Sequence, residues 1–186
     1  QETSSRNSGV IHAGIYYPKK SLKSQLCVEG NKLLYRYLKN RNIKFDRCGK
    51  IIVSANREEN EILKKIKSNA LKNNANAILL NQKETKKLEP NVTCFSSIYS
   101  PNTGVLDIHE LMQNFEIDIE NNKGTILYNN EVESVIPKTN YLQFTIKSDS
   151  KKYKTNILIN STGLYSHKLA AKVKSLNKSF IPKVKF

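Results

Sequence analysis

The most specific stretch of this 186-residue sequence reads Thr3-Ser4-Ser5-Arg6-Asn7-Ser8-Gly9-Val10-Ile11-His12-Ala13-Gly14. It supplies hydroxyls, a guanidinium, an amide and two glycines within 12 residues. Such donors suit a diphosphate or another extended polar ligand that lies along the backbone. Apolar residues follow at once, so the stretch is expected to be an ordered loop that enters a buried segment rather than a polar tail.

The composition is that of a globular chain. Hydrophobic residues make up 38% and charged residues 25%, which is enough to bury a core in one ordinary domain or one and a half small ones. No apolar run approaches the ~20 residues of a membrane span, and no secretory leader is expected. Cys27, Cys48 and Cys94 lie far apart, so neither a disulfide framework nor a zinc site is predicted, and no metal is assigned.

The net charge of +15 could indicate nucleic acid or an anionic membrane surface as a partner. We discount both, because lysine dominates over arginine and the lysines are dispersed in pairs such as Lys19-Lys20 and Lys151-Lys152. Nucleic-acid faces favour arginine and interleaved aromatic residues. A solvated basic surface is the better interpretation, and no nucleic acid is expected as a partner.

Apolar spacing predicts helices over 21–40, capped by Ser21, over 58–73, and after Asp107, where Glu110 would complete a capping box. Strands are predicted at 50–53, 77–80, 97–100, 125–128, 131–136, 141–146, 154–159 and, at the chain end, 181–186. The apolar run Ile157-Leu158-Ile159 has the pattern of a buried parallel strand. It leads through Asn160-Ser161-Thr162-Gly163 into a helix from Ser166, an arrangement that brings backbone N–H groups to a phosphate or sugar.

Several motifs of this sequence together resemble those of a known family. The run from Ser4 to Tyr17, followed by Ser21-Leu22-Lys23 and Leu26-Cys27-Val28-Glu29-Gly30-Asn31, resembles FAD-dependent oxidoreductases of the D-amino-acid-oxidase type. Within them it is most similar to the L-2-hydroxyglutarate dehydrogenase/oxidase group. The resemblance continues through 47–53, Leu88-Glu89-Pro90, the segment 99–107 and 160–166. It therefore spans nearly the whole chain in the right order.

The resemblance implies a mixed α/β fold, in which a Rossmann-like FAD-binding domain is interrupted by a substrate domain with a mixed or antiparallel sheet. Residues 1–46 and 106–175 would belong to the FAD-binding domain, 47–105 to the substrate domain, and 176–186 would begin its second segment. The family's GxGxxG block would precede Gln1, so the chain is expected to be a fragment, inactive by itself.

The resemblance also implies the cofactor site. The residues expected to bind FAD are Thr3, Ser4, Ser5, Arg6, Asn7, Ser8, Gly9, Val10, Val132, Thr162, Gly163 and Leu164. Val132 could equally be a plain core residue, because a backbone contact leaves no trace in the sequence.

His12 has two interpretations that the sequence leaves open. It is a buried core histidine, or it lies beside the flavin and accepts a proton from the substrate hydroxyl or tunes the flavin electrostatically. His109 and His167 are expected at the surface, and Cys27 in the core.

The implied reaction is oxidation of a small 2-hydroxy acid to the 2-oxo acid, with a quinone, another carrier or oxygen accepting the electrons. Oxidation of an amine, an amino acid or glycerol 3-phosphate is the alternative within the class. A basic module that binds nucleic acid or a membrane surface is the alternative outside it. The expected location is the cytoplasm, with at most peripheral association with the inner membrane.

Overall fold

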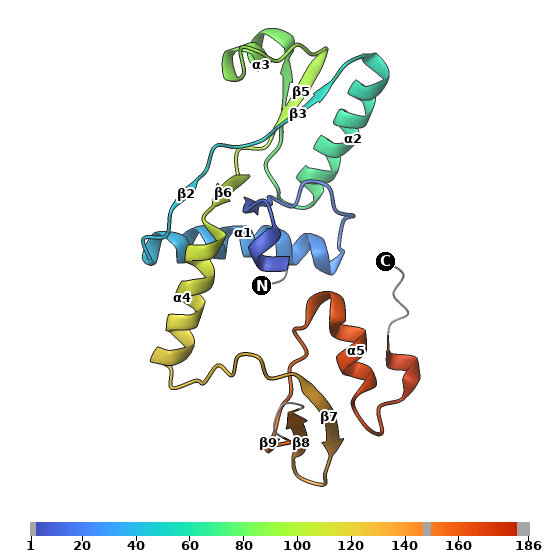
Figure 1. Cartoon of the computed structure of the whole chain (residues 1–186). Coiled ribbons are helices and arrows are strands. Elements are labelled where there is room, and N and C mark those ends of the chain that lie inside the picture. The colour runs from blue at the N-terminus through green and yellow to red at the C-terminus, as the bar shows by residue number, and fades with distance from the viewer. Residues whose placement is uncertain (1–2, 147–149, 182–186) are drawn as a thin grey trace. The chain divides into compact units, whose positions relative to one another are not determined.

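The computed structural model describes residues 3–146 and 150–181, which fall into two compact units, residues 1–124 and 125–186 (Figure 1). Helices and antiparallel strands alternate in the first unit, and a small sheet with a short helix makes up the second. The mixed helix and sheet content that the sequence predicts is confirmed. The assignment of segments to FAD-binding and substrate domains remains a prediction.

The first sheet joins segments that are distant in the sequence. Strand β6 (Gly104–Leu106) lies between β1 (Val10–Ile11) and β2 (Phe45–Asp46), and all pairings are antiparallel. Helices α1 (Leu22–Asn40) and α4 (Ile108–Asn121) contribute to the core beside it. The buried residues of this core are Ile11, Leu38, Ile43 and Leu111.

The second sheet has the order β3-β5-β4, with strands Ile51–Ser54, Ser96–Tyr99 and Ile78–Asn81. Helices α2 (Arg57–Lys72) and α3 (Gln82–Leu88) pack against it. Its core also takes in Ala13 and Ile15 from the loop after β1, whereas Ile11 of β1 belongs to the first core, so the segment 11–15 contributes to both cores of the unit. The remaining buried core residues are Leu63, Ala70, Ala75, Ala77 and Ile98.

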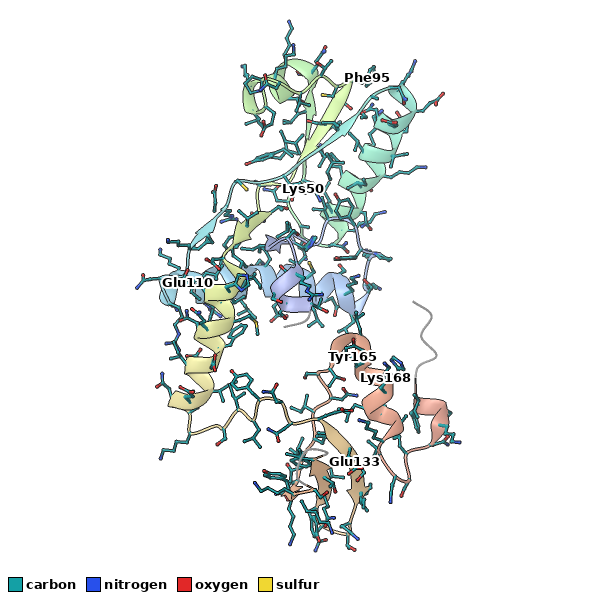
Figure 2. All side chains as sticks on the ribbon, viewed as in Figure 1. Lys50, Phe95, Glu110, Glu133, Tyr165 and Lys168 are labelled. Carbon is teal, nitrogen blue, oxygen red and sulfur yellow. The ribbon has the colours of Figure 1, made fainter. Side chains whose placement is uncertain are left out.

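Local capping chemistry explains why the helices begin where the sequence predicts. The Ser21 side chain accepts a hydrogen bond from Ser24 N at 3.1 Å, and the Asp107 carboxylate accepts from the backbone of the next turn. The predicted capping box at Glu110 is wrong. Its carboxylate, labelled in Figure 2, instead accepts a hydrogen bond from Lys44 N at 3.0 Å and ties α4 to the chain before β2.

The second unit is built on the antiparallel sheet β7-β8-β9, with strands Val132–Pro137, Leu142–Ile146 and Lys152–Thr155. The 3-10 turn η2 (Gly163–Tyr165) leads into α5 (Ser166–Ala171), and a further 3-10 turn η3 (Lys178–Phe180) follows. The chain after α5 returns to β7, where Val135 and Val173 form a parallel bridge.

Three strand predictions need correction or fall outside the description. Residues 125–128 form no strand, and β9 ends at Thr155 rather than continuing through the apolar run. Ile157 and Ile159 are 75% and 78% exposed, because no described strand pairs with this run and β structure requires a neighbour. The predicted strand at the chain end lies outside the described residues from position 182 onward.

Candidate functional site

The loop that precedes β1 has a defined backbone. Residues Thr3–Arg6 form the 3-10 turn η1, and the Asn7 side chain then closes the loop by accepting from Gly9 N at 2.7 Å and donating to Ser4 O at 2.9 Å. Gly9 has φ +65, and a Cβ there would lie 2.6 Å from Leu106 O. Glycine is therefore required both by the left-handed backbone and by the close approach of β6.

A buried amide on α1, Asn31, ties this loop to a turn that lies 71 residues after Asn31 in the sequence. Asn31 is 7% exposed, and its Nδ2 donates to His12 O at 3.0 Å and to Asn102 O at 2.9 Å. Both amide protons are thereby used on backbone carbonyls, and His12 O has no other donor than the weak Cys27 thiol at 3.7 Å in the described chain. The loop and the turn 100–103 are held on the same helix by one side chain.

The turn itself is packed closely against α1 and β2. Tyr35 Oη donates to Asn102 O at 3.1 Å, and the Arg47 guanidinium donates to Asn102 Oδ1 while lying over the Tyr35 ring. Burial is the main cause that raises the pKa of the Tyr35 phenol. A Cβ on Gly104 would collide with Tyr35 Oη and with the Asp46 carbonyl, so this position has room for glycine alone.

Most of the predicted FAD-binding side chains in the loop face solvent. The exposed ones are Thr3, Ser4, Arg6, Asn7 and Ser8; Ser5 and Val10 are half-buried and Gly9 is buried. Within residues 3–146 and 150–181, no group pairs with the Arg6 guanidinium or with the Thr3, Ser4 and Ser8 hydroxyls. An uncommitted cation among free hydroxyls fits the diphosphate of a dinucleotide.

The prediction that His12 could be a buried core histidine is wrong. Its side chain is exposed, whereas the residues on either side, Ile11 and Ala13, are 2% and 6% exposed. Alternation along the extended chain turns the ring outward while its neighbours enter the two cores. The backbone is held by Asn31, so the exposed ring extends from an immobilised position.

The other predicted cofactor residues belong to the second unit. Val132 is half-buried in β7, and its carbonyl accepts a hydrogen bond from Lys172 Nζ at 2.7 Å. Thr162, Gly163 and Leu164 are exposed in the turn before α5. Gly163 has φ +52, and apart from its chain neighbours no atom of the described residues lies within 4 Å of a Cβ built there. An open, left-handed glycine leaves space for the close approach of a ligand.

The cysteines and acidic residues of the described chain offer no metal site. No group of three or more metal-ligating side chains is present among the described residues. Cys94 is buried, and the predicted core residue Cys27 is half-buried, with burial raising the pKa of its thiol. His109 is exposed as predicted, whereas His167 is half-buried. Among the described helices, none has the length and apolar character needed to cross a membrane.

Sequence reasoning missed the residues that shape the loop from outside it. Asn31 and Asn102 lie within the motifs quoted for the resemblance, and Tyr35 lies one helical turn after Asn31. The roles of all three depend on contacts across the fold. The sequence signal available for Asn31 was a polar residue at a position of the helix where the apolar spacing predicts a buried side chain, and Asn31 is indeed buried.

Known structures with this fold are flavoenzymes. The dithionite-reduced L-alpha-glycerophosphate oxidase from Mycoplasma pneumoniae, with FAD bound, superposes with a TM-score of 0.87 and 26% identity, over 94% of this chain and 47% of that one. Glycine oxidase from Geobacillus kaustophilus superposes with a TM-score of 0.80 at 15% identity, over 91% and 47%. The first of these structures, an oxidase with FAD bound, points to the class of flavin-dependent oxidoreductases.

The sequence comparison names the family within that class. The model of the DAO family, FAD dependent oxidoreductase, matches residues 1–184, and the chain belongs to this family, whose cofactor is FAD. The chain is 33% identical to the human mitochondrial L-2-hydroxyglutarate dehydrogenase, over 88% of this chain and 38% of that protein. It is 30% identical to L-2-hydroxyglutarate dehydrogenase of Escherichia coli K12, over 94% and 41%. The chain thus spans about two fifths of the length of these relatives.

Proposed function

We propose that this chain is part of a flavoenzyme that oxidises a small 2-hydroxy acid of the L-2-hydroxyglutarate type to the 2-oxo acid. The observation that carries the substrate class is the shared name of relatives from mammals, a plant and bacteria at 30–38% identity. The free hydroxyls and guanidinium of the loop support the cofactor half of the proposal, because they offer the donors that a dinucleotide requires.

The chain's residues would have separate roles in holding FAD. The polar side chains of the loop would bind the diphosphate and the ribityl chain: Thr3, Ser4, Ser5, Arg6, Asn7 and Ser8. Asn7 also closes the loop through its hydrogen bonds to Gly9 N and Ser4 O. The backbone of Gly9 and Val10 would approach the flavin ring. In the second unit, the Val132 main chain and the turn Thr162–Leu164 would contact the nucleotide, with Gly163 leaving the necessary space.

FAD, when bound, supplies an acceptor for the hydride that leaves C2 of the substrate. We assign to His12 the removal of the hydroxyl proton in the same step. Its exposed ring is free to approach a substrate, and Asn31 fixes its backbone. A positioned base of this kind contributes typically about 10²–10⁴ to the rate. Electrons would then pass to a quinone, another carrier or oxygen.

The test uses the product of the longest reading frame that contains this chain. Purified protein is assayed with a dye acceptor and L-2-hydroxyglutarate, its D-isomer, glycerol 3-phosphate or glycine. Turnover of the L-hydroxy acid with little turnover of the others is expected. His12→Gln should lower kcat by at least about 10²-fold and remove the acidic limb of its pH profile, whereas His109→Gln, an exposed histidine in α4, should change neither. Flavin-loaded protein that turns over none of the hydroxy acids would refute the substrate assignment.

A second candidate is oxidation of glycerol 3-phosphate. It is favoured by the TM-score of 0.87 with an enzyme named for that activity, at 26% identity. The substrate panel above separates the two candidates, since only one of them predicts preferential oxidation of the phosphate ester.

A further inference from the structure

The sheet β1-β6-β2, whose strands β2 and β6 are labelled in Figure 1, has one face that packs on helices and one that stays open. On the packed face, Ile11 of β1 is buried and Leu106 of β6 lies against the core to which α1 and α4 contribute. Side chains alternate between the two faces along a strand. Val10, Val105 and Asp46 therefore point to the opposite, open face.

Val105 occupies the middle of this open face. It lies directly opposite Val10 of β1 on one side and Asp46 of β2 on the other, so the three side chains form one row across the sheet. A strand that is paired on both sides can be exposed only through a face, and Val105 remains 41% exposed. The two valines thus form a small apolar shelf, which no described element of the first unit fully covers.

This Val10–Val105 shelf is continuous with the residues proposed for the cofactor and the substrate. His12 lies two positions after Val10, so alternation brings its exposed ring to the same side of the chain. At the other end of β1, Gly9 O accepts a hydrogen bond from Leu106 N at 2.9 Å, which holds the preceding loop against β6. A ligand that follows this loop as far as Val10 would meet Val105 next.

We propose that the flavin ring of FAD packs on the Val10–Val105 shelf, which makes Val105 a further residue of the cofactor site. The inference rests on the proposed function, in which the loop before β1 holds the diphosphate of FAD, the cofactor of the family. The two parts of the site match the two ends of the cofactor. Hydroxyls and a guanidinium suit the diphosphate, whereas apolar side chains suit a flat aromatic ring that leaves water.

The experiment uses the full protein that contains this chain, stripped of its flavin and then titrated with FAD or with ADP-ribose. ADP-ribose carries the nucleotide and the diphosphate but no flavin. Val105→Ala removes two methyl groups from the shelf and should weaken FAD binding at least about fivefold, since one buried methylene contributes about a factor of four. The affinity for ADP-ribose should change less than about twofold, because this probe does not reach the shelf.

A second variant keeps the shape of the side chain and changes its polarity. Val105→Thr places a hydroxyl against the ring and should weaken FAD binding at least about fivefold, since burial of an unpaired hydroxyl is costly. The visible absorption band of the bound flavin should also shift. The matched controls are Val53→Ala and Val53→Thr, because Val53 is a valine of β3 with a similar exposure of 46% that lies in the other sheet of the unit. These controls should leave both affinities and the spectrum unchanged, and circular dichroism checks that all four variants fold.

Unchanged FAD affinity and an unchanged flavin spectrum in both Val105 variants would overturn this inference and leave the proposed function standing. Equal losses of affinity for FAD and ADP-ribose would overturn it as well, because they would mean that Val105 supports the fold of the site rather than the ring. A wild-type protein that binds no FAD would refute the proposed function and this inference together. Flavin-loaded protein that oxidises no hydroxy acid would refute the proposed substrate alone, since the titrations measure binding and not turnover.

Discussion

Replacement of Asn31 by alanine should destabilise the first unit by about 2–3 kcal/mol. The substitution removes two hydrogen bonds to backbone carbonyls, each with a net value of about 1 kcal/mol. Asn102 O keeps the Tyr35 hydroxyl at 3.1 Å, whereas His12 O keeps only the Cys27 thiol at 3.7 Å, a weak donor. The additional penalty for an unsatisfied acceptor, about 1 kcal/mol or more, therefore falls on His12.

The assay is urea denaturation of the protein followed by circular dichroism, with hydrogen exchange read at the amides of β1 and β6. Asn114→Ala is the matched control, because that amide donates to Glu110 O within its own helix and the change should cost less than about 1 kcal/mol. Exchange should accelerate at Ile11 in the Asn31 variant alone. If the two variants lose the same stability, or if β1 keeps its protection, then Asn31 does not hold the loop and the reasoning is refuted.

Three further predictions follow from single positions. Gly163→Val should strip FAD from the full protein while it stays folded, since φ +52 and the open space suit glycine beside a ligand; purification with a full complement of flavin would contradict this. Gly30→Ala should raise the free energy of unfolding by about 0.5–1 kcal/mol, because this glycine lies inside α1 and alanine is the better helix former. Outside the helix's own backbone, no atom of the described residues lies within 4 Å of a Cβ at this position. A loss of stability in the same denaturation assay would count against this prediction. The hydrogen bond from the Tyr37 hydroxyl, and after it the Arg41 guanidinium, hold the pKa of Asp118 below its ordinary value. The stability that Asp118 contributes is therefore present above the pKa of the unfolded chain and is lost as the pH falls through the pKa of the folded state. Asp118→Asn should flatten the fall of the free energy of unfolding at acid pH, and an unchanged fall would exclude this role.

The elements that the sequence predicted well are those specified by neighbouring residues. Helix α1 begins after Ser21 because that hydroxyl caps the next turn, and the same local chemistry starts α4 at Asp107. All the residues of such a capping signal lie within about one helical turn of each other in the sequence, so the signal can be recognised without the fold. The family was equally accessible, because the motif at 3–14 is contiguous.

The parts that could not be predicted depend on partners distant in the chain. The run at Ile157–Ile159 has the composition of a buried strand, but a strand forms only where another strand offers hydrogen bonds, and none of the described ones does so here. The outward direction of the His12 ring depends in the same way on the cores that receive Ile11 and Ala13.

Two motifs that are far apart in the sequence form one structural element. Gly9 O accepts a hydrogen bond from Leu106 N at 2.9 Å, and Ile11 pairs with Gly104 in the β1–β6 ladder. The loop that precedes β1 therefore takes its shape from the segment 99–107, whose own turn is fixed through Asn102. Because the approach of β6 leaves no room for a Cβ at Gly9, a change in either segment must displace the other. Substitutions around residue 104 should consequently affect flavin binding as strongly as substitutions within the loop itself.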